Sequence, residues 1–146
     1  MSVFRYRLQP ILSIKERMEE HEKNKLGKEM RKLDQEEKKL QHIYGKQHNC
    51  FGNIVAESNQ GIQAHRLQQY QCYLTDINRQ LDYQTENVGK ASKDVEKQRE
   101  QLIEVAKEKK MLEVLREKKR HAFIYEQNKQ EEKRVDELIS YKYTNK

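Results

Sequence analysis

Hydrophobic side chains recur at alternating steps of three and four residues between residues 66 and 95. The positions are Leu67, Tyr70, Leu74, Ile77, Leu81, Gln84, Val88, Ala91 and Val95. This spacing places them on one stripe of an α-helix and is typical of a coiled-coil seam, with a polar break at Gln84.

A second stretch, residues 26–54, has the same rhythm and a polar break at Glu37. Its seam positions are Leu26, Met30, Leu33, Glu37, Leu40, Tyr44, Gln47, Phe51 and Ile54. When the chain is folded back on itself, Leu33 faces Val88 and the two polar breaks face each other. Because each seam is found without reference to the other, their match predicts an antiparallel helical hairpin.

The expected fold is therefore all-α: one domain, residues 1–146, forming a long antiparallel two-helix coiled-coil hairpin. We expect helices at about 10–58 and 62–139, a turn at 58–62 and a frayed tail at 140–146. Pro10 suits a first helical turn, and Gly61 suits the left-handed conformation after a helix. At about 1.5 Å per residue the helices measure roughly 70 and 115 Å, so the second should overhang from Glu113 onward.

Two details concern the N-terminal part. Phe4, Tyr6 and Leu8 alternate with Arg5 and Arg7, which indicates an extended or loosely helical segment. The apolar stripe that begins at Leu8 is out of step with the seam downstream, so the pattern predicts a local slip near residues 21–25.

The composition limits the size of any core. Charged residues make up 37% and hydrophobic residues 34% of the chain, enough for a seam but not for a large globular interior. Disorder is the alternative, and the sustained heptads disfavour it. There is no integral membrane segment or signal-peptide core, so we expect a cytoplasmic protein. Cys50 and Cys72 fit free thiols in a reducing compartment, and a cross-link between them is a weaker alternative.

No catalytic set is visible, and we predict no enzymatic activity, no cofactor and no metal site. The sequence has no glycine-rich phosphate loop and no nucleophile elbow. None of the five histidines forms a pair at helical spacing. His42, His48 and His65 could gather near the turn, but exposed histidines are the preferred interpretation.

The region around the turn is the better candidate for binding. Between residues 41 and 75 the only charged residues are Lys46, Glu57 and Arg66. Uncharged aromatic surface is typical of interface cores, although the same aromatics could simply fill the seam. Ile43 and Tyr73, which stand off the predicted seam, are the sharper candidates. The predicted contact residues are Ile43, Tyr44, Phe51, Tyr70, Tyr73 and Ile77.

A basic stretch follows residue 106, and Arg5 and Arg7 return to its level in the hairpin. Its cations are Lys107, Lys109, Lys110, Arg116, Lys118, Lys119 and Arg120. Acidic residues interrupt it, and it carries no known docking motif. An acidic protein groove explains it as well as a nucleic acid or an acidic membrane does.

Three segments together resemble the FliJ family of flagellar type III export proteins: FRYRLQPILSIKE (4–16), GIQAHRLQQYQCYL (61–74) and LREKKRHAFIYEQNKQEEKRVDELI (115–139). The resemblance implies a hairpin similar to the central stalk of rotary ATPases. It also implies three partners: the flagellar export ATPase hexamer, the cytoplasmic domain of the export gate membrane protein, and substrate-specific export chaperones.

For the sites, the resemblance implies gate contact around Ile43, Tyr44, Tyr73 and Ile77, and ATPase contact at the termini. The terminal residues are Phe4, Arg5, Arg7, Arg116, Lys119, Lys133, Asp136, Glu137 and Leu138. A monomer bound peripherally at the inner face of the membrane, at the flagellar basal body, would fit these partners. A structural coiled-coil scaffold and, less favoured, a basic nucleic-acid-binding coiled coil are the competing interpretations.

Overall fold

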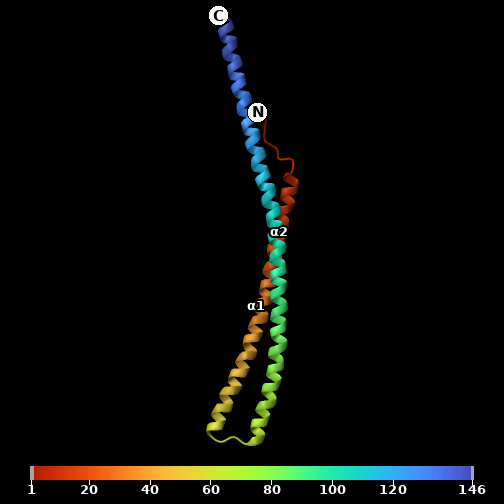
Figure 1. The fold of residues 1–146 in the computed structure, drawn as a ribbon, viewed down its shortest axis with the longest axis vertical. Coiled ribbons are helices and arrows are strands. Elements are labelled where there is room, and N and C mark those ends of the chain that lie inside the picture. Colours follow the sequence, from red (N-terminus) through yellow and green to blue (C-terminus); the bar gives the residue numbers. More distant parts are fainter. Residues whose placement is uncertain (1, 146) are drawn as a thin grey trace. The chain divides into compact units, whose positions relative to one another are not determined.

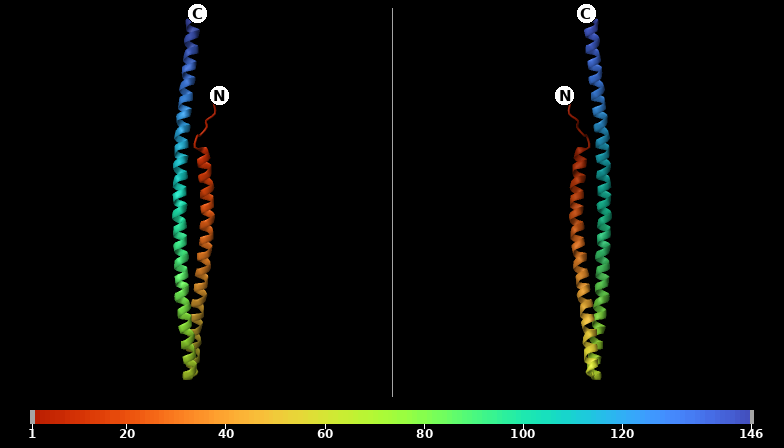
Figure 2. Two further views of the ribbon diagram at one scale, coloured as in Figure 1. Left: turned by 90° about the vertical axis from the view of Figure 1, so that its right-hand side faces the viewer. Right: turned by 90° about the vertical axis from the view of Figure 1, so that its left-hand side faces the viewer.

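The computed structural model describes residues 2–145 and contains two long helices, α1 (Gln9–Asn59) and α2 (Ala64–Thr144). The helices pack side by side and run in opposite directions (Figures 1 and 2). This confirms the predicted all-α antiparallel coiled-coil hairpin with a longer second helix. Met1 and Lys146, the ends of the expected single domain, lie outside the described residues, and the single-domain organisation stays a prediction.

The chain divides into two compact units. The hairpin unit comprises Glu22–Leu102, and the terminal unit comprises Met1–His21 together with Ile103–Lys146. Both helices contribute to each unit.

The turn of the hairpin unit lies at residues 60–63 and is close to its predicted place. Gly61 has a φ of 88°, the left-handed conformation expected for this glycine. The backbone N–H groups of Gln60 and Gly61 donate hydrogen bonds to the carbonyl oxygens of Glu57 and Ser58, at 3.1 and 3.3 Å. These bonds satisfy two of the carbonyl groups left unpaired at the end of α1.

The seam of α2 follows the sequence prediction. Ile77, Leu81, Gln84 and Val95 are buried, and Gln98 extends the same spacing. Leu67, the first predicted position, is instead about half exposed. The alternating steps of three and four residues therefore identify the buried stripe of α2 correctly from Tyr70 onward.

The seam of α1 differs from the prediction by one residue at every second position. Leu26, Leu33, Leu40, Gln47 and Ile54 are less exposed, as expected. Between them, the positions turned inward are Glu29, Glu36, Ile43 and Cys50, whereas Met30, Glu37, Tyr44 and Phe51 are exposed. The predicted placement of Tyr44 and Phe51 in the seam, and of Ile43 outside it, was wrong.

Hydrogen bonds account for this shift, because they allow glutamates to occupy seam positions. The Gln84 side-chain amide donates to the backbone oxygen of Glu36 at 2.9 Å and also to its carboxylate. Two heptads away, Gln98 donates in the same way to the backbone oxygen and carboxylate of Glu22. Gln84 therefore pairs with Glu36 and not with Glu37, and each buried amide has an acceptor.

The predicted slip near residues 21–25 does not occur. The less exposed positions of α1 continue without interruption through Leu12, Lys15, Glu19, Glu22 and Leu26. The chain keeps this register because Lys15 and Glu19 form ion pairs with Glu108 and Lys109 of α2. Leu12 is fully buried in this register, and the long side chains of Lys15 and Glu19 occupy the next seam positions. The neighbouring Ile11 and Met18 are exposed.

In the terminal unit the segment before α1 is extended and lies along α2 (Figure 1). The Tyr6 hydroxyl donates to the backbone oxygen of Leu112 at 3.0 Å, and Tyr6 is buried. The Phe4 ring packs on Phe123 with 5.5 Å between ring centroids. Gln127 donates to the backbone and hydroxyl oxygens of Ser2. The uncovered part of α2 therefore begins after Gln127, not at Glu113 as the helix lengths predicted.

The C-terminal part of α2 is longer than predicted. The helix continues to Thr144, whereas the sequence suggested fraying after Ile139. Residues 140–144 contain no glycine or proline, and the Thr144 hydroxyl donates to the backbone oxygen of Ser140. Lys146, the last residue of the expected frayed tail, lies outside the described residues.

Candidate partner-binding sites

The first candidate site surrounds the turn of the hairpin unit, and its two oppositely charged residues neutralise each other. The Arg66 guanidinium donates two hydrogen bonds to the Glu57 carboxylate, at 3.2 and 3.3 Å. The Tyr70 hydroxyl donates to the same carboxylate at 2.6 Å. Among the described residues from 41 to 75, this pairing leaves Lys46 as the one charged group without an ion pair.

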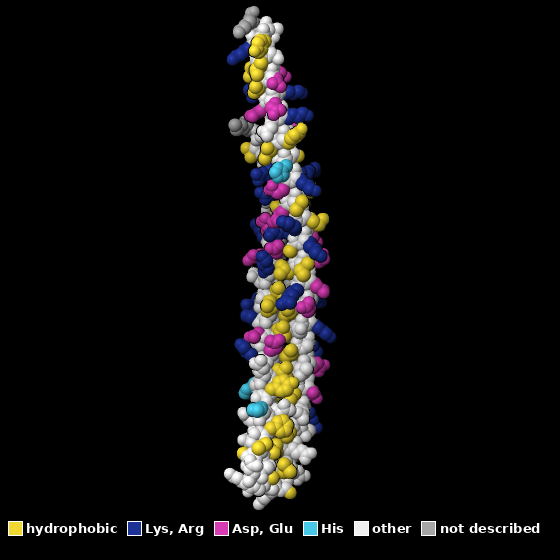
Figure 3. Space-filling view, turned by 60° about the vertical axis from the view of Figure 1, so that its left-hand side comes forward, with side chains coloured by type: hydrophobic (Ala, Val, Ile, Leu, Met, Phe, Trp, Pro, Cys, Tyr) yellow, Lys and Arg dark blue, Asp and Glu magenta, His cyan; other side chains and the backbone are white. Residues whose placement is uncertain are grey.

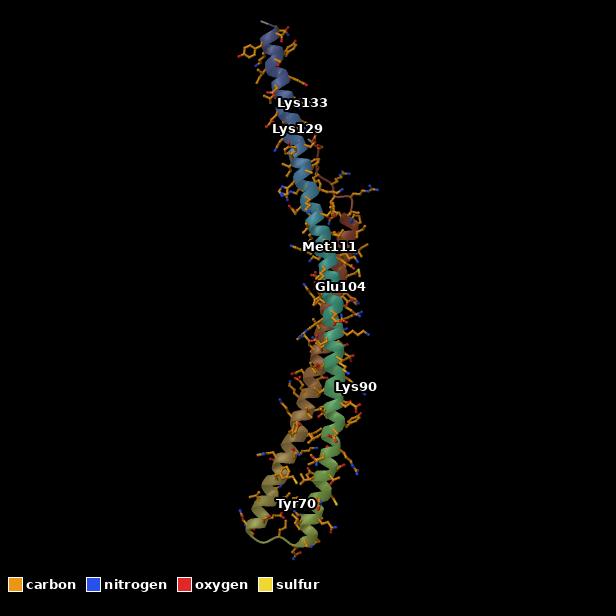
Figure 4. All side chains as sticks on the ribbon, viewed as in Figure 1. Tyr70, Lys90, Glu104, Met111, Lys129 and Lys133 are labelled. Carbon is orange, nitrogen blue, oxygen red and sulfur yellow. The ribbon has the colours of Figure 1, made fainter. Side chains whose placement is uncertain are left out.

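The same three residues close the turn. Arg66 stacks over the Tyr70 ring at 4.9 Å from its centroid, and Tyr70 lies close to the turn (Figure 4). The hydrogen bond from Arg66 holds the pKa of Glu57 below its usual range. The hydrogen bond to Glu57 in turn raises the pKa of the Tyr70 hydroxyl. Tyr70 is thus engaged inside the hairpin.

The remaining candidates of this site divide into exposed and buried side chains. Tyr44, Phe51 and Tyr73 are 51%, 50% and 46% exposed. Ile43 is half-buried in the seam, and Ile77 is buried and serves packing. On the face shown in Figure 3, hydrophobic side chains form a line along the hairpin unit, and the surroundings of the turn carry few charged groups.

The Glu57 cluster predicts a pH dependence. A carboxyl group whose pKa is lowered in the folded state stabilises the fold above its unfolded pKa, which is about 4.3, and loses this contribution as the pH falls through the lowered folded value. The thermal unfolding midpoint should therefore fall on acidification from pH 6 to pH 3, and Glu57→Gln should reduce this fall. Circular dichroism melts at each pH measure it.

Glu96→Gln is the matched control, because the one ion pair of Glu96 among residues 2–145 is an exposed pair with Arg99 on the same helix. Equal pH dependence in Glu57→Gln and in Glu96→Gln would show that the Glu57 cluster does not stabilise the turn.

The second candidate site lies in the terminal unit, where arginines of the extended segment meet α2. Arg5 and Arg116 line one open cavity of about 380 Å³ together with Phe4, Tyr6 and Gln9. Arg7 and Lys119 are exposed. Phe4 is half-buried against Phe123, so its ring holds the segment in place, and the arginines are the groups presented to solvent.

The remaining predicted residues of this site belong to the C-terminal part of α2. Lys133, Asp136, Glu137 and Leu138 are exposed, as is every described residue of α2 from Asn128 onward. Lys129 and Lys133 lie on this part, where no other segment of the terminal unit runs alongside (Figure 4). This part of α2 also exposes Val135 and Ile139. It therefore presents both apolar and charged groups, and none of its described residues is buried against the rest of the terminal unit.

The described residues were also compared with the requirements of a metal site and of a membrane-spanning helix. Within residues 2–145, no three His, Cys, Asp or Glu side chains are gathered in a way that would hold a metal ion. Over the same residues, neither helix has an apolar stretch long enough to cross a membrane. Cys50 is buried and Cys72 is exposed, and both are free thiols.

Sequence reasoning missed the contacts that fix the extended segment. Tyr6 and Leu112 are 106 residues apart, so no local pattern links them. The alternation of Phe4, Tyr6 and Leu8 with two arginines was the available signal, since it indicates an extended strand with one apolar side. Arg66 and Tyr70 could also have been paired from their four-residue spacing on one helix.

A comparison with known protein families shows which family the chain is related to. The family described as flagellar FliJ protein matches residues 4–146. The chain belongs to this family. The match includes the extended segment from Phe4, both helices and the turn, so it covers both candidate sites of this FliJ-family chain. No curated protein and no solved structure matches the chain.

Membership of the FliJ family makes the chain a component of flagellar protein export, and this confirms the resemblance drawn from three sequence segments. The protein therefore acts in flagellar biosynthesis, protein export and motility.

Proposed function

We propose that this FliJ-family protein is a non-enzymatic coupling component of the flagellar export apparatus that binds two partners through two different units. The hairpin unit contacts the cytoplasmic domain of the export gate membrane protein around its turn. The terminal unit contacts the export ATPase hexamer and promotes its assembly and activity. The protein acts as a monomer on the cytoplasmic side of the membrane, near the flagellar basal body.

The observation that carries the proposal is the contrast between the two sites. The chain is 37% charged, yet the surroundings of the turn expose Tyr44, Phe51 and Tyr73 and pair Glu57 with Arg66. Exposed aromatic side chains in a region with few charged groups are typical of the centre of a protein interface. A solvated coiled coil that only spaces other domains has no need to maintain such a surface.

The terminal unit favours a different partner. Arg5, Arg7 and Arg116 have no ion pair among the described residues, and α2 continues past Gln127 with exposed apolar and charged groups. Unpaired guanidinium groups favour contact with carboxylates. An isolated helix of this polarity is marginal in water, so a partner that encloses it would add stability. A ring-shaped ATPase offers such an enclosure, and export chaperones are further partners of the same unit.

The experiment that tests the gate site replaces exposed aromatics by alanine. Tyr44→Ala combined with Tyr73→Ala should weaken binding of the gate's cytoplasmic domain by about thirtyfold or more, as expected for interface anchors. Helicity should not change, because both side chains are about half exposed. Isothermal titration calorimetry with the full-length chain measures the affinity.

Tyr83→Ala is the control, since Tyr83 is an even more exposed tyrosine on α2 that lies outside residues 41–75. If the double variant bound the gate domain as tightly as the Tyr83 variant, the gate would not bind at this site.

A further inference from the structure

The α1 helix of the hairpin unit carries two overlapping seams, and the structure uses the less hydrophobic one. Both seams share Leu26, Leu33, Leu40, Gln47 and Ile54. The seam in use adds Glu29, Glu36, Ile43 and Cys50, and the unused one adds Met30, Glu37, Tyr44 and Phe51. The second set follows the first by one residue at each heptad. The unused set therefore forms a row beside the seam with one residue in each heptad.

The two seams are related by a rotation of α1 about its own axis. Successive residues of a helix are about 100° apart, so changing from one set to the other while keeping the shared positions turns the helix by about 50°. The α2 seam is the same in both arrangements, because its positions from Tyr70 to Gln98 alternate regularly in the structure. Only α1 has to move.

The two arrangements are stabilised by different interactions: hydrogen bonds favour the observed one, and burial of apolar side chains favours the rotated one. The observed one gains the hydrogen bonds from Gln84 to Glu36 and from Gln98 to Glu22, and it buries Cys50. The rotated one would instead bury the exposed portions of Met30, Tyr44 and Phe51. Burial of an aromatic or methionine side chain and formation of a charge-assisted hydrogen bond stabilise a packed arrangement by comparable amounts, so neither seam has an overwhelming advantage.

We infer that α1 has two packing states on α2 and that the rotation between them controls whether Tyr44 and Phe51 are presented to a partner. In the observed state these aromatics are exposed and Cys50 is buried. In the rotated state the aromatics are buried and Cys50 is exposed. An apolar partner at the turn binds only the observed state and shifts the population toward it. This regulatory consequence rests on the proposed gate contact, whereas the two packing states do not.

The test uses the two cysteines of the full-length chain. Cys50 is the reporter, and exposed Cys72 is the internal reference. Two matched variants place the same leucine at adjacent positions, Glu36→Leu and Glu37→Leu. Each is combined with Gln84→Leu so that no buried amide is left without an acceptor. Leucine at position 36 favours the observed seam, and leucine at position 37 favours the rotated one.

Alkylation with N-ethylmaleimide, followed by mass spectrometry, should modify Cys50 about tenfold faster, relative to Cys72, in the Glu37 variant than in the Glu36 variant. The second reporter is Phe51→Cys in a Cys50→Ser background. At this cysteine the order of the modification rates should be reversed: modification should be slower in the Glu37 variant than in the Glu36 variant. Rotation predicts opposite changes at neighbouring residues, whereas local unfolding exposes both.

Equal rates in the two variants, or changes in the same direction at positions 50 and 51, would overturn the inference. Titration with the gate's cytoplasmic domain separates this outcome from failure of the proposed function. If the modification rates at positions 50 and 51 change in opposite directions but the wild-type chain does not bind the gate domain, the two packing states are supported and the proposed gate function is wrong. If the wild type binds and the Glu37 variant binds about tenfold more weakly, both stand.

Discussion

A chain that ends after Gln127 should bind the export ATPase at least about tenfold more weakly than the full-length protein, and it should no longer stimulate ATP hydrolysis. The truncation removes residues 128–146, which include Lys133, Asp136 and Leu138. Every residue from Asn128 to Asn145 is exposed, and those in the helix form an exposed part of α2. The expected size of the loss follows from removing several contact side chains at once, since each tenfold step in affinity corresponds to about 1.4 kcal/mol.

The thermal unfolding midpoint should change little in the same truncated chain. Residues that pack against nothing else in their unit contribute little to the free energy of unfolding. The contacts of Ser2 with Gln127, Phe4 with Phe123 and Tyr6 with Leu112 all remain. A loss of ATPase binding therefore cannot be attributed to unfolding if calorimetry gives an unchanged midpoint.

A second truncation, after Ile139, is the control. It shortens the helix but keeps Val135, Leu138 and Ile139 together with the charges around them. Binding of the ATPase should be largely retained. If both truncated chains bound as tightly as the full-length chain, the C-terminal part of α2 would have to be removed from the proposed site.

The sequence predicts the fold of this protein well because its two helices obey a simple periodicity. The α2 seam is unambiguous: Ile77, Leu81 and Val95 are the only apolar choices at their positions, and their neighbours are polar. The turn is equally clear, since Gly61 can adopt the positive φ that the backbone requires. For these elements, local pattern and tertiary packing favour the same structure.

The α1 seam could not be settled in this way. At residues 43–44 and 50–51 the sequence offers Ile-Tyr and Cys-Phe, and hydrophobicity alone favours either member of each pair. The observed choice depends on Gln84 and Gln98, whose amides need acceptors on α1. A pattern that counts apolar residues gives no weight to a glutamate whose stem is buried and whose carboxylate accepts a hydrogen bond.

In the candidate sites, too, some features can be predicted from the sequence and others depend on tertiary contacts. The uncharged surroundings of the turn could be recognised from composition, because they depend on which residues are present. Which aromatics are exposed depends on a rotation of about 50° in α1, and this angle is not encoded in the heptad spacing. The position of Phe4 depends on Phe123, far along the chain.

Replacing Ile77 by alanine should produce the largest loss of stability of any single substitution considered in the hairpin unit. Ile77 is 1% exposed, the least exposed side chain among the buried residues of α2. Large-to-small substitutions at buried sites lower the free energy of unfolding by about 2–5 kcal/mol. Urea denaturation followed by circular dichroism measures this difference for the full-length chain.

Leu67→Ala is the matched control, because it removes a side chain of the same volume from a position predicted for the same seam. Leu67 is 47% exposed, and its substitution should cost less than about 1.5 kcal/mol. A two-helix hairpin has a single line of seam contacts, so neighbouring layers cannot compensate for the cavity left at Ile77. If the two substitutions destabilised the chain equally, the hairpin would not be held together by the α2 seam, and a partner surface that depends on the fixed orientation of α1 would have no structural basis.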